Sequence, residues 1–233
     1  KCKPILGHML EGLPVESNPL LVNYGEGKQL EKVYEDAHML VVNKPEGLLS
    51  VPGKTIQDSV YHRMQTEYPD ATGPITVHRL DQDTSGLMLI AKTKEAHKNL
   101  QQQFLDKTIK KRYIALLDGE ISEKEGIIDL PLRVDINDRP KQMVCYENGK
   151  CSITRFKVIA MLNGVTKIQL NPITGRSHQL RMHCAHKEGL NTAIVGDNLY
   201  GKKGTRLHLH AEFIQFIHPA TKKKMKFSAK ANF

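Results

Sequence analysis

The stretch His78-Arg79-Leu80-Asp81-Gln82-Asp83-Thr84-Ser85-Gly86 guides the interpretation of this sequence. It sets an arginine close to a carboxylate, continues as a polar turn, and ends in a glycine, where a chain can bend at little steric cost. The apolar run Leu87-Met88-Leu89-Ile90-Ala91 follows and is short enough to be a buried strand. We therefore expect Asp81 to lie on a loop held by a rigid strand, a common place for working side chains. The alternative is that Asp81 or Asp83 only caps a turn.

This stretch resembles the signature of the RluA family of pseudouridine synthases, in which His-Arg-Leu-Asp, two variable residues and Thr-Ser-Gly follow one another. Further matches, in the family's order, run from about residue 34 to residue 233. The resemblance implies an α+β protein with the pseudouridine synthase fold, a mixed and largely antiparallel sheet flanked by helices and loops. Periodicity alone predicts only mixed α and β structure. We expect an N-terminal arm at residues 1–30, which is rich in proline and glycine, and a catalytic domain at residues 31–233.

The composition favours a polyanionic partner. The chain has 34 lysines and arginines against 25 acidic residues, a formal net charge of +9, and such a surplus promotes binding to phosphates. A generic basic soluble protein is the alternative. No apolar run approaches membrane-spanning length, and no leader sequence is recognisable, so we expect a cytoplasmic protein without membrane contact. The four cysteines form no C-x-x-C pair and are expected to be free thiols.

Three further segments match the family's motifs. Lys44-Pro45-Glu46-Gly47 resembles a loop that braces the catalytic loop. Lys111-Arg112-Tyr113-Ile114-Ala115 fits a pattern whose tyrosine lies against the target base, and aromatic stacking on an unpaired base is worth about 1–3 kcal/mol. Gly175-Arg176-Ser177-His178-Gln179-Leu180-Arg181 resembles the motif whose first arginine pairs with the catalytic aspartate. The structural alternatives are a strand tyrosine that is half-buried and lysines that are merely solvated.

The resemblance thus implies three catalytic residues. Asp81 acts as nucleophile or electrostatic catalyst, and Arg176 is its ion-pair partner, because a nearby arginine keeps a carboxylate ionised. Tyr113 stacks on the base and is a candidate for handling a proton. The expected RNA contacts are basic side chains and one imidazole: Arg79, Lys44, Lys111, Arg139, Lys141, His178 and Arg181.

The resemblance is more specific for Arg79 and for the pair Arg139 and Lys141. By resemblance, Arg79 fills the space that the flipped uridine vacates; its alternative role is a structural salt bridge. Arg139 and Lys141 belong to the stretch Arg139-Pro140-Lys141-Gln142, which resembles the RluA branch more closely than the wider family. They could bind phosphates or simply form a basic loop near a hairpin.

Local signals predict several element boundaries. Asp58 can cap a helix that runs to about Tyr68. Thr93 can cap a second helix, whose stripe of Ala96, His97, Leu100 and Phe104 is read as core packing. Ser177 is a plausible N-cap for a third helix, in which Leu180 and Cys184 face the core. The dipeptide Asn163-Gly164 predicts a hairpin.

The implied reaction is the isomerisation of uridine to pseudouridine in RNA, with no cofactor. A base within folded RNA must leave its stack to be reached, which favours a stem-loop of large-subunit rRNA, of a tRNA anticodon arm, or of both. We expect a monomer. The spacing of His178, His183 and His186 meets no recognised zinc pattern, so we expect no metal.

Two other function classes stay open at this point. A non-catalytic RNA-binding protein would need the same basic surface without the pairing of Asp81 and Arg176. A glycoside hydrolase could use Asp81 and Asp83 as a pair of carboxylates, although the absence of tryptophan and the basic charge count against a sugar-binding cleft.

Overall fold

The computed structural model describes residues 30–233. The predicted arm at residues 1–30, apart from Leu30, and Cys2 lie outside the described residues. The helices are α1 (Val60–Glu67), α2 (Lys94–Leu105) and α3 (Gln179–Ala185). The strands are β1 (Glu31–Glu35), β2 (Met39–Lys44), β3 (Ser85–Ala91), β4 (Lys110–Leu117), β5 (Glu125–Asp129), β6 (Leu132–Val134), β7 (Gln142–Val144), β8 (Ile153–Leu162), β9 (Val165–Pro172), β10 (Leu209–Ile217) and β11 (Lys224–Ser228).

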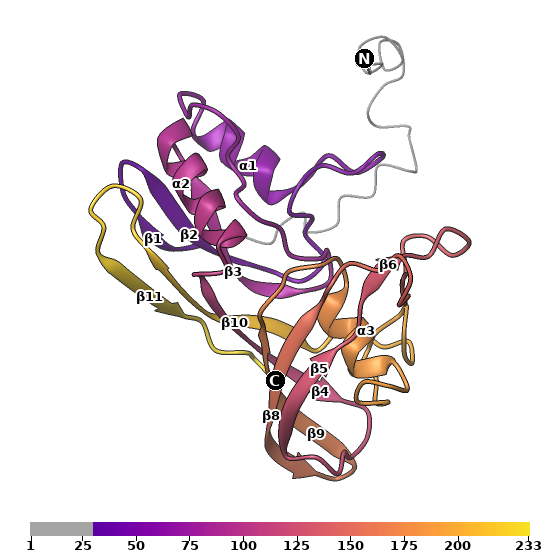
Figure 1. Cartoon of the computed structure of the whole chain (residues 1–233). Helices are drawn as coiled ribbons and strands as arrows, with labels where there is room; N and C mark the ends of the chain where they lie inside the picture. Colours follow the sequence, from indigo (N-terminus) through magenta and orange to yellow (C-terminus); the bar gives the residue numbers. More distant parts are fainter. Residues whose placement is uncertain (1–29) are drawn as a thin grey trace.

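One large sheet organises these elements (Figure 1). Its strand order is β1-β2-β3-β10-β4-β9-β8-β5, and β11 pairs with β10; β6 and β7 form a separate two-stranded sheet. The pair β3–β10 is parallel, whereas the other strand pairs between residues 30 and 233 are antiparallel. The expected α+β architecture, with a mixed and largely antiparallel sheet, is confirmed.

Strand β3 is buried along its whole length because helices cover both of its faces. Successive side chains of a strand point to opposite faces. On one face α2 packs on alternate residues of β3, through Ala96 and Leu100 against Leu87 and Leu89. On the other face α1 does the same, through Val60 and Met64 against Met88 and Ile90. The loop before β3, which carries Asp81, is therefore anchored on a strand with little freedom to move.

Gly86 allows β3 and β10 to approach each other. It pairs with Ala211 in the parallel register and has a φ of +116°. A Cβ atom at this position would lie 2.4 Å from the Ala211 carbonyl oxygen. The glycine of the opening motif is thus required by the close contact between two central strands.

Most of the local predictions are confirmed. The Thr93 side chain accepts a hydrogen bond from Ala96 N and caps α2. Leu180 and Cys184 pack in the core beneath β9. The hairpin between β8 and β9 turns at Asn163 and Gly164, both with positive φ.

Two predicted helix caps are wrong. Ser59, not Asp58, caps α1 by accepting from His62 N; Asp58 instead pairs with Arg63 at 2.7 Å. Helix α3 begins after His178, not Ser177, and His178 has left-handed backbone angles and no side-chain cap. In the first case the serine lies nearer the first free N–H group, and in the second the tertiary contacts of His178 decide the turn.

Candidate active site

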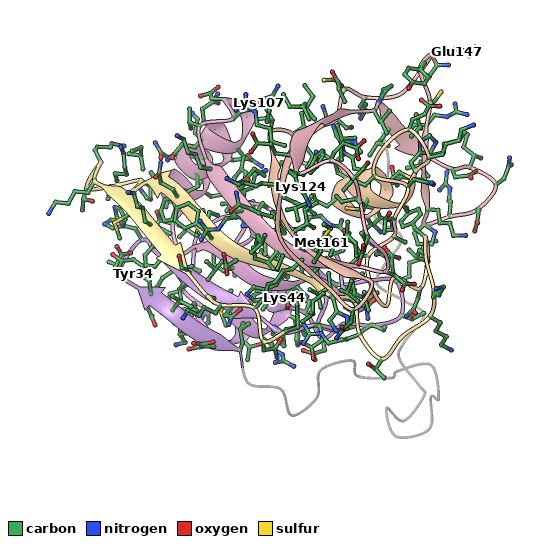
Figure 2. The ribbon with its side chains drawn as sticks, turned by 90° about the horizontal axis from the view of Figure 1, so that it is seen from below. Tyr34, Lys44, Lys107, Lys124, Glu147 and Met161 are labelled. Carbon is green, nitrogen blue, oxygen red and sulfur yellow. The ribbon has the colours of Figure 1, made fainter. Side chains whose placement is uncertain are left out.

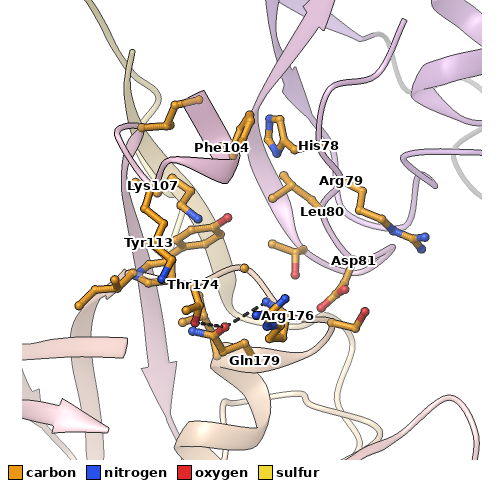
Figure 3. A pocket seen from close by; sticks show the side chains of 18 of the residues that line it. His78, Arg79, Leu80, Asp81, Phe104, Lys107, Tyr113, Thr174, Arg176 and Gln179 are labelled. Atoms are coloured by element: carbon orange, nitrogen blue, oxygen red, sulfur yellow. Dashed lines mark hydrogen bonds between the residues drawn. The ribbon is translucent and has the colours of Figure 1, made fainter. Parts of the chain in front are cut away.

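A pocket of about 510 Å³ opens where the loop before β3 faces β4 and the start of α3 (Figure 3). Its walls carry the catalytic triplet expected from the sequence, Asp81, Tyr113 and Arg176. It is also lined by Arg79, Lys111 and Arg181 from the expected RNA contacts, and by Thr84, Phe104, Lys107 and Gln179, among others. Segments far apart in the sequence thus converge on one cavity.

Asp81 lies at the start of a tight turn. The Thr84 backbone N–H donates to the Asp81 carbonyl oxygen at 3.1 Å, and Thr84 leads directly into β3. The Asp81 carboxylate is partly exposed to the pocket, and no hydrogen bond or ion pair engages it among residues 30–233. The group best placed to act on a substrate is therefore a carboxylate that the described part of the protein leaves uncommitted.

Lys44 stabilises this turn from inside the protein. Its ammonium donates to the carbonyl oxygens of Pro45, Leu48 and Gln82 at 2.7–2.9 Å. Lys44 is the last residue of β2 (labelled in Figure 2), and its side chain is 0% exposed. The bracing role implied by the resemblance fits this geometry, but the expectation that Lys44 contacts RNA is wrong, because the ammonium is buried.

Tyr113 and Lys111 extend from β4 into the pocket, one on each side of Arg112. Tyr113 is held between Ala211 of β10 and Leu170 of β9. Burial, with a contribution from the charge of Asp81, raises the pKa of the Tyr113 hydroxyl, which is therefore protonated at neutral pH. Burial lowers the pKa of Lys111 to about 8, so this lysine is a cation that loses its charge readily.

Arg176 lines the pocket, but the structure does not show the expected ion pair. Its Nε donates to the Cys151 carbonyl oxygen at 3.2 Å, and the ion pairs within residues 30–233 do not include one between Arg176 and Asp81. The backbone of Arg176 is fixed, because its N–H donates to Gln179 Oε1 at 3.0 Å. Its side chain is exposed and can change partner.

Arg181 is not a surface contact for RNA. It is 2% exposed and donates to both carboxylate oxygens of Asp197, at 2.6 and 2.9 Å. Its guanidinium also lies 5.4 Å from the centre of the Tyr200 ring. The prediction that Arg181 contacts RNA is therefore corrected: Arg181 forms a buried structural ion pair within the pocket wall.

His178 lies behind the pocket wall, half-buried. Its Nδ1 is 2.8 Å from the Tyr200 hydroxyl, which itself accepts from Gln142 N at 2.7 Å. Burial lowers the pKa of His178, although the charge of Asp81 opposes this. His178 thus links α3 to the β6–β7 hairpin.

Of the remaining expected RNA contacts, Arg79 and Arg139 are exposed and Lys141 is half-buried. Arg79 is on the pocket rim, and its side chain points away from Lys107 in Figure 3. Arg139 is exposed in the loop between β6 and β7, outside the pocket, and Lys141 follows it and pairs with Asp138 at 2.7 Å. These positions leave Arg79 and Arg139 accessible to a polyanion.

Some pocket residues were not foreseen as functional. Phe104 was read as core, yet it lines the pocket and stacks on His78 with ring centres 4.6 Å apart. Thr84 belongs to the opening motif. Because that motif was interpreted as a polar turn, the burial of the Thr84 hydroxyl in the pocket wall was not predicted. Asp197 and Tyr200 do not line the pocket but support its wall. They lie in the segment Gly196-Asp197-Asn198-Leu199-Tyr200-Gly201, and the resemblance of its Gly-Asp and Tyr-Gly pairs to the family's sequence was the available signal for them.

Metal-ligating side chains do not gather in groups of three or more within residues 30–233. His183, one of the histidines considered for zinc, is buried between Thr154 Oγ1 at 2.9 Å and the Leu130 carbonyl oxygen at 3.3 Å. Burial lowers its pKa to about 4. No helix of the described residues is long and apolar enough to cross a membrane.

Comparison with known proteins identifies the class. A family model described as RNA pseudouridylate synthase matches residues 38–186, well over half of the chain. The protein belongs to the RNA pseudouridylate synthase family and is an RNA pseudouridine synthase. The alternatives of a non-catalytic RNA-binding protein and a glycoside hydrolase are therefore set aside.

Individual relatives show which members of that family the chain resembles. The chain is 45% identical over 209 residues to the dual-specificity RNA pseudouridine synthase RluA of Escherichia coli K12, an alignment covering 86% of this chain and 93% of that protein. It is 44% identical to the protein of the same description in Yersinia pestis, covering 86% and 98%. Among solved structures, human RNA pseudouridylate synthase domain containing 1 matches with a TM-score of 0.73 and 28% identity, covering 87% of this chain and 83% of that one.

Proposed function

We propose that this protein converts uridine to pseudouridine in stem-loops of both large-subunit rRNA and a tRNA anticodon arm, acting as a monomer in the cytoplasm. The observation that carries the proposal is the Asp81 carboxylate, unpaired among the described residues and aimed into a pocket with Tyr113 and Arg176. The dual specificity is supported by the similarity to relatives described as dual-specificity enzymes.

The chemistry needs no group donor. The N1–C1′ bond of the uridine breaks, the base turns within the pocket, and C5 bonds to C1′. The hydrogen on C5 leaves as a proton and N1 takes up a proton, so atoms and electrons balance. Asp81 supplies the carboxylate that acts at C1′ or on the base, and the protonated Tyr113 lies against the base while it turns.

Arg176 is proposed to pair with Asp81 when RNA is bound. Its exposed side chain is held by one hydrogen bond to a backbone carbonyl, which an ion pair in a dry site can replace because charge-assisted bonds are stronger. The unstacking of the target base costs a few kcal/mol. Phosphate contacts by Arg79, Lys111, Arg139 and Lys141 would offset that cost.

The test uses purified protein, without added cofactor, on rRNA and tRNA from a strain that lacks such an enzyme. New pseudouridines are mapped by a chemical reverse-transcription stop. We expect one discrete site in each RNA, lost by at least about 100-fold in rate with Asp81→Asn. Asp83→Asn, a matched change two residues away, should retain activity. Modification that survives Asp81→Asn would refute the assignment of Asp81, and a site in only one RNA class would refute dual specificity.

A further inference from the structure

The pocket wall contains a buried hydroxyl without a partner. Thr84 is 2% exposed, and its Oγ1 makes no hydrogen bond. Within residues 30–233, three buried side-chain nitrogen or oxygen atoms are unpaired in this way, and Thr84 Oγ1 is the hydroxyl among them. The other two are guanidinium nitrogens of arginines that do not line the pocket. Buried polar groups are usually paired, so this exception calls for an explanation.

The neighbouring hydroxyls show that partners are available in this region. Ser85, the next residue, places its Oγ 2.8 Å from His210 Nδ1. Ser50, which packs under the same turn, donates to the Leu80 carbonyl oxygen at 2.6 Å. The unpaired state of Thr84 is therefore a property of its position and not of a generally loose core.

The Asp81 carboxylate is a complementary group in the same turn. The two residues line the same pocket, and the hydrogen bond from Thr84 N to the Asp81 carbonyl oxygen closes the turn that joins them. A carboxylate and a hydroxyl at the two ends of such a turn are well placed to pair, as short polar side chains in turns do. Among residues 30–233, neither the Asp81 carboxylate nor the Thr84 hydroxyl makes a hydrogen bond.

Other groups near Asp81 have commitments elsewhere. The Arg181 guanidinium is bound by Asp197, and Arg176 Nε by the Cys151 carbonyl oxygen. The charged and titratable groups around Asp81 come from its own turn, β4, α3 and the loop after α3: Asp83, Lys111, Tyr113, Arg176, His178, Arg181, Asp197 and Tyr200. The Thr84 hydroxyl, by contrast, is an uncharged hydrogen-bond donor in the same turn as Asp81.

We propose that Thr84 is a positioning residue for Asp81: when a flipped uridine fills the pocket, the Thr84 hydroxyl turns about χ1 and donates a hydrogen bond to the carboxylate. This rests on the proposed function. Threonine has more than one accessible χ1 rotamer, so the movement needs no backbone change. In a pocket from which water is expelled, the bond keeps the carboxylate ionised and fixes its direction.

Two substitutions separate this role from a structural one. Thr84→Val keeps the shape but removes the unpaired hydroxyl, so the RNA-free protein should become more stable, with a higher Tm. Its single-turnover rate should nevertheless fall roughly 10–100-fold, the size expected for one hydrogen bond to a charged group, while its Kd for RNA stays unchanged. Thr84→Ser keeps the hydroxyl and loses a buried methyl group, so it should be less stable but nearly as active as the wild type.

The pH profile of the single-turnover rate gives a third readout. Removing a donor to the ionised form makes a carboxylate easier to protonate. The acidic limb of the profile should therefore move up by about one pH unit in Thr84→Val and stay in place in Thr84→Ser. A purely structural threonine would change the Tm without moving this limb.

Three results would overturn the inference. These are a Thr84→Val protein less stable than the wild type, a Thr84→Val rate equal to that of the wild type, and a reduced rate with an unshifted acidic limb. Failure of the proposed function looks different, because the wild type would then modify none of the RNAs, whereas the Tm order of the two variants would still report on the Thr84 hydroxyl.

Discussion

Arg181 of α3 and Asp197 of the following loop share two hydrogen bonds, of 2.6 and 2.9 Å, with side chains that are 3% and 0% exposed. Asp197 Oδ1 also accepts from the backbone N–H groups of Leu199 and Tyr200. Tyr200 in turn contacts His178, at the start of α3. This buried pair therefore fixes the loop that supports one wall of the pocket.

We expect Arg181→Met to lower the free energy of unfolding by about 3–5 kcal/mol, because it leaves a buried carboxylate without its counter-charge. Adding Asp197→Asn removes that charge and keeps an oxygen for the two backbone N–H groups, so the double variant should be more stable than Arg181→Met alone. Equilibrium urea unfolding measures both. The exposed pair of Lys202 and Asp118 is the control, since Lys202→Met should cost no more than about 1 kcal/mol.

Lys44→Met should destabilise the protein by about 2–4 kcal/mol, because three carbonyl oxygens of two adjoining loops lose a charged donor. The rate of pseudouridine formation should fall as well, since one of these carbonyls belongs to Gln82, next to Asp81. Urea unfolding and single-turnover assays check the two effects. Lys54→Met, on an exposed loop, should change neither, and equal effects at both lysines would contradict the bracing role.

Gly86→Ala should prevent the protein from folding stably, with a cost above about 4 kcal/mol, because the new Cβ would lie 2.4 Å from the Ala211 carbonyl oxygen and 2.6 Å from its nitrogen. Gly47 makes a matched control. It also has a positive φ, +84°, but a Cβ there meets nothing within 4 Å. Gly47→Ala should therefore cost only the backbone strain of about 1–2 kcal/mol. Thermal unfolding and soluble yield of the two variants test the difference.

Lys111 should make the stability of the protein depend on alkaline pH. Burial lowers its pKa in the folded state from 10.5 to about 8, so between these values the unfolded chain binds more protons. The free energy of unfolding contributed by this group therefore rises as the pH increases from about 8 to 10.5. Lys111→Met should flatten that rise and stabilise the protein at pH 7 by about 1–3 kcal/mol.

Urea unfolding across this pH range measures the effect. Lys110→Met, at the exposed neighbouring position, should retain the wild-type dependence. An alkaline rise that persists in Lys111→Met would show that another group causes it. If Lys111 also binds a phosphate, Lys111→Met should reduce the salt dependence of RNA binding by about one unit of slope.

The sequence predicted the positions of some site residues correctly and the roles of others incorrectly. Asp81 and Tyr113 could be placed because each belongs to a contiguous motif attached to a strand, where local pattern and position coincide. Lys44 and Arg181 were expected to contact RNA because their motifs carry positive charge. A motif does not reveal whether that charge faces water, and both side chains are buried.

The caps of α1 and α3 show the same limit. Asp58 and Ser59 are both good capping residues, and the choice between them depends on where the chain enters the helix. Histidine is not a preferred N-cap residue. The contact of His178 with Tyr200 nevertheless stabilises a left-handed backbone conformation, which is unfavourable for a residue with a side chain.

The sequence by itself determined the class of the protein, the strand behind Asp81, and the hairpin at Asn163 and Gly164, because these depend on residues that are neighbours along the chain. Only the tertiary structure decided that Lys44 supports the turn from inside, that Arg181 is committed to Asp197, and that the hydroxyl of Thr84 is buried without a partner. Those outcomes depend on which groups from distant segments meet and which are withdrawn from water, and neither is a local property of the chain.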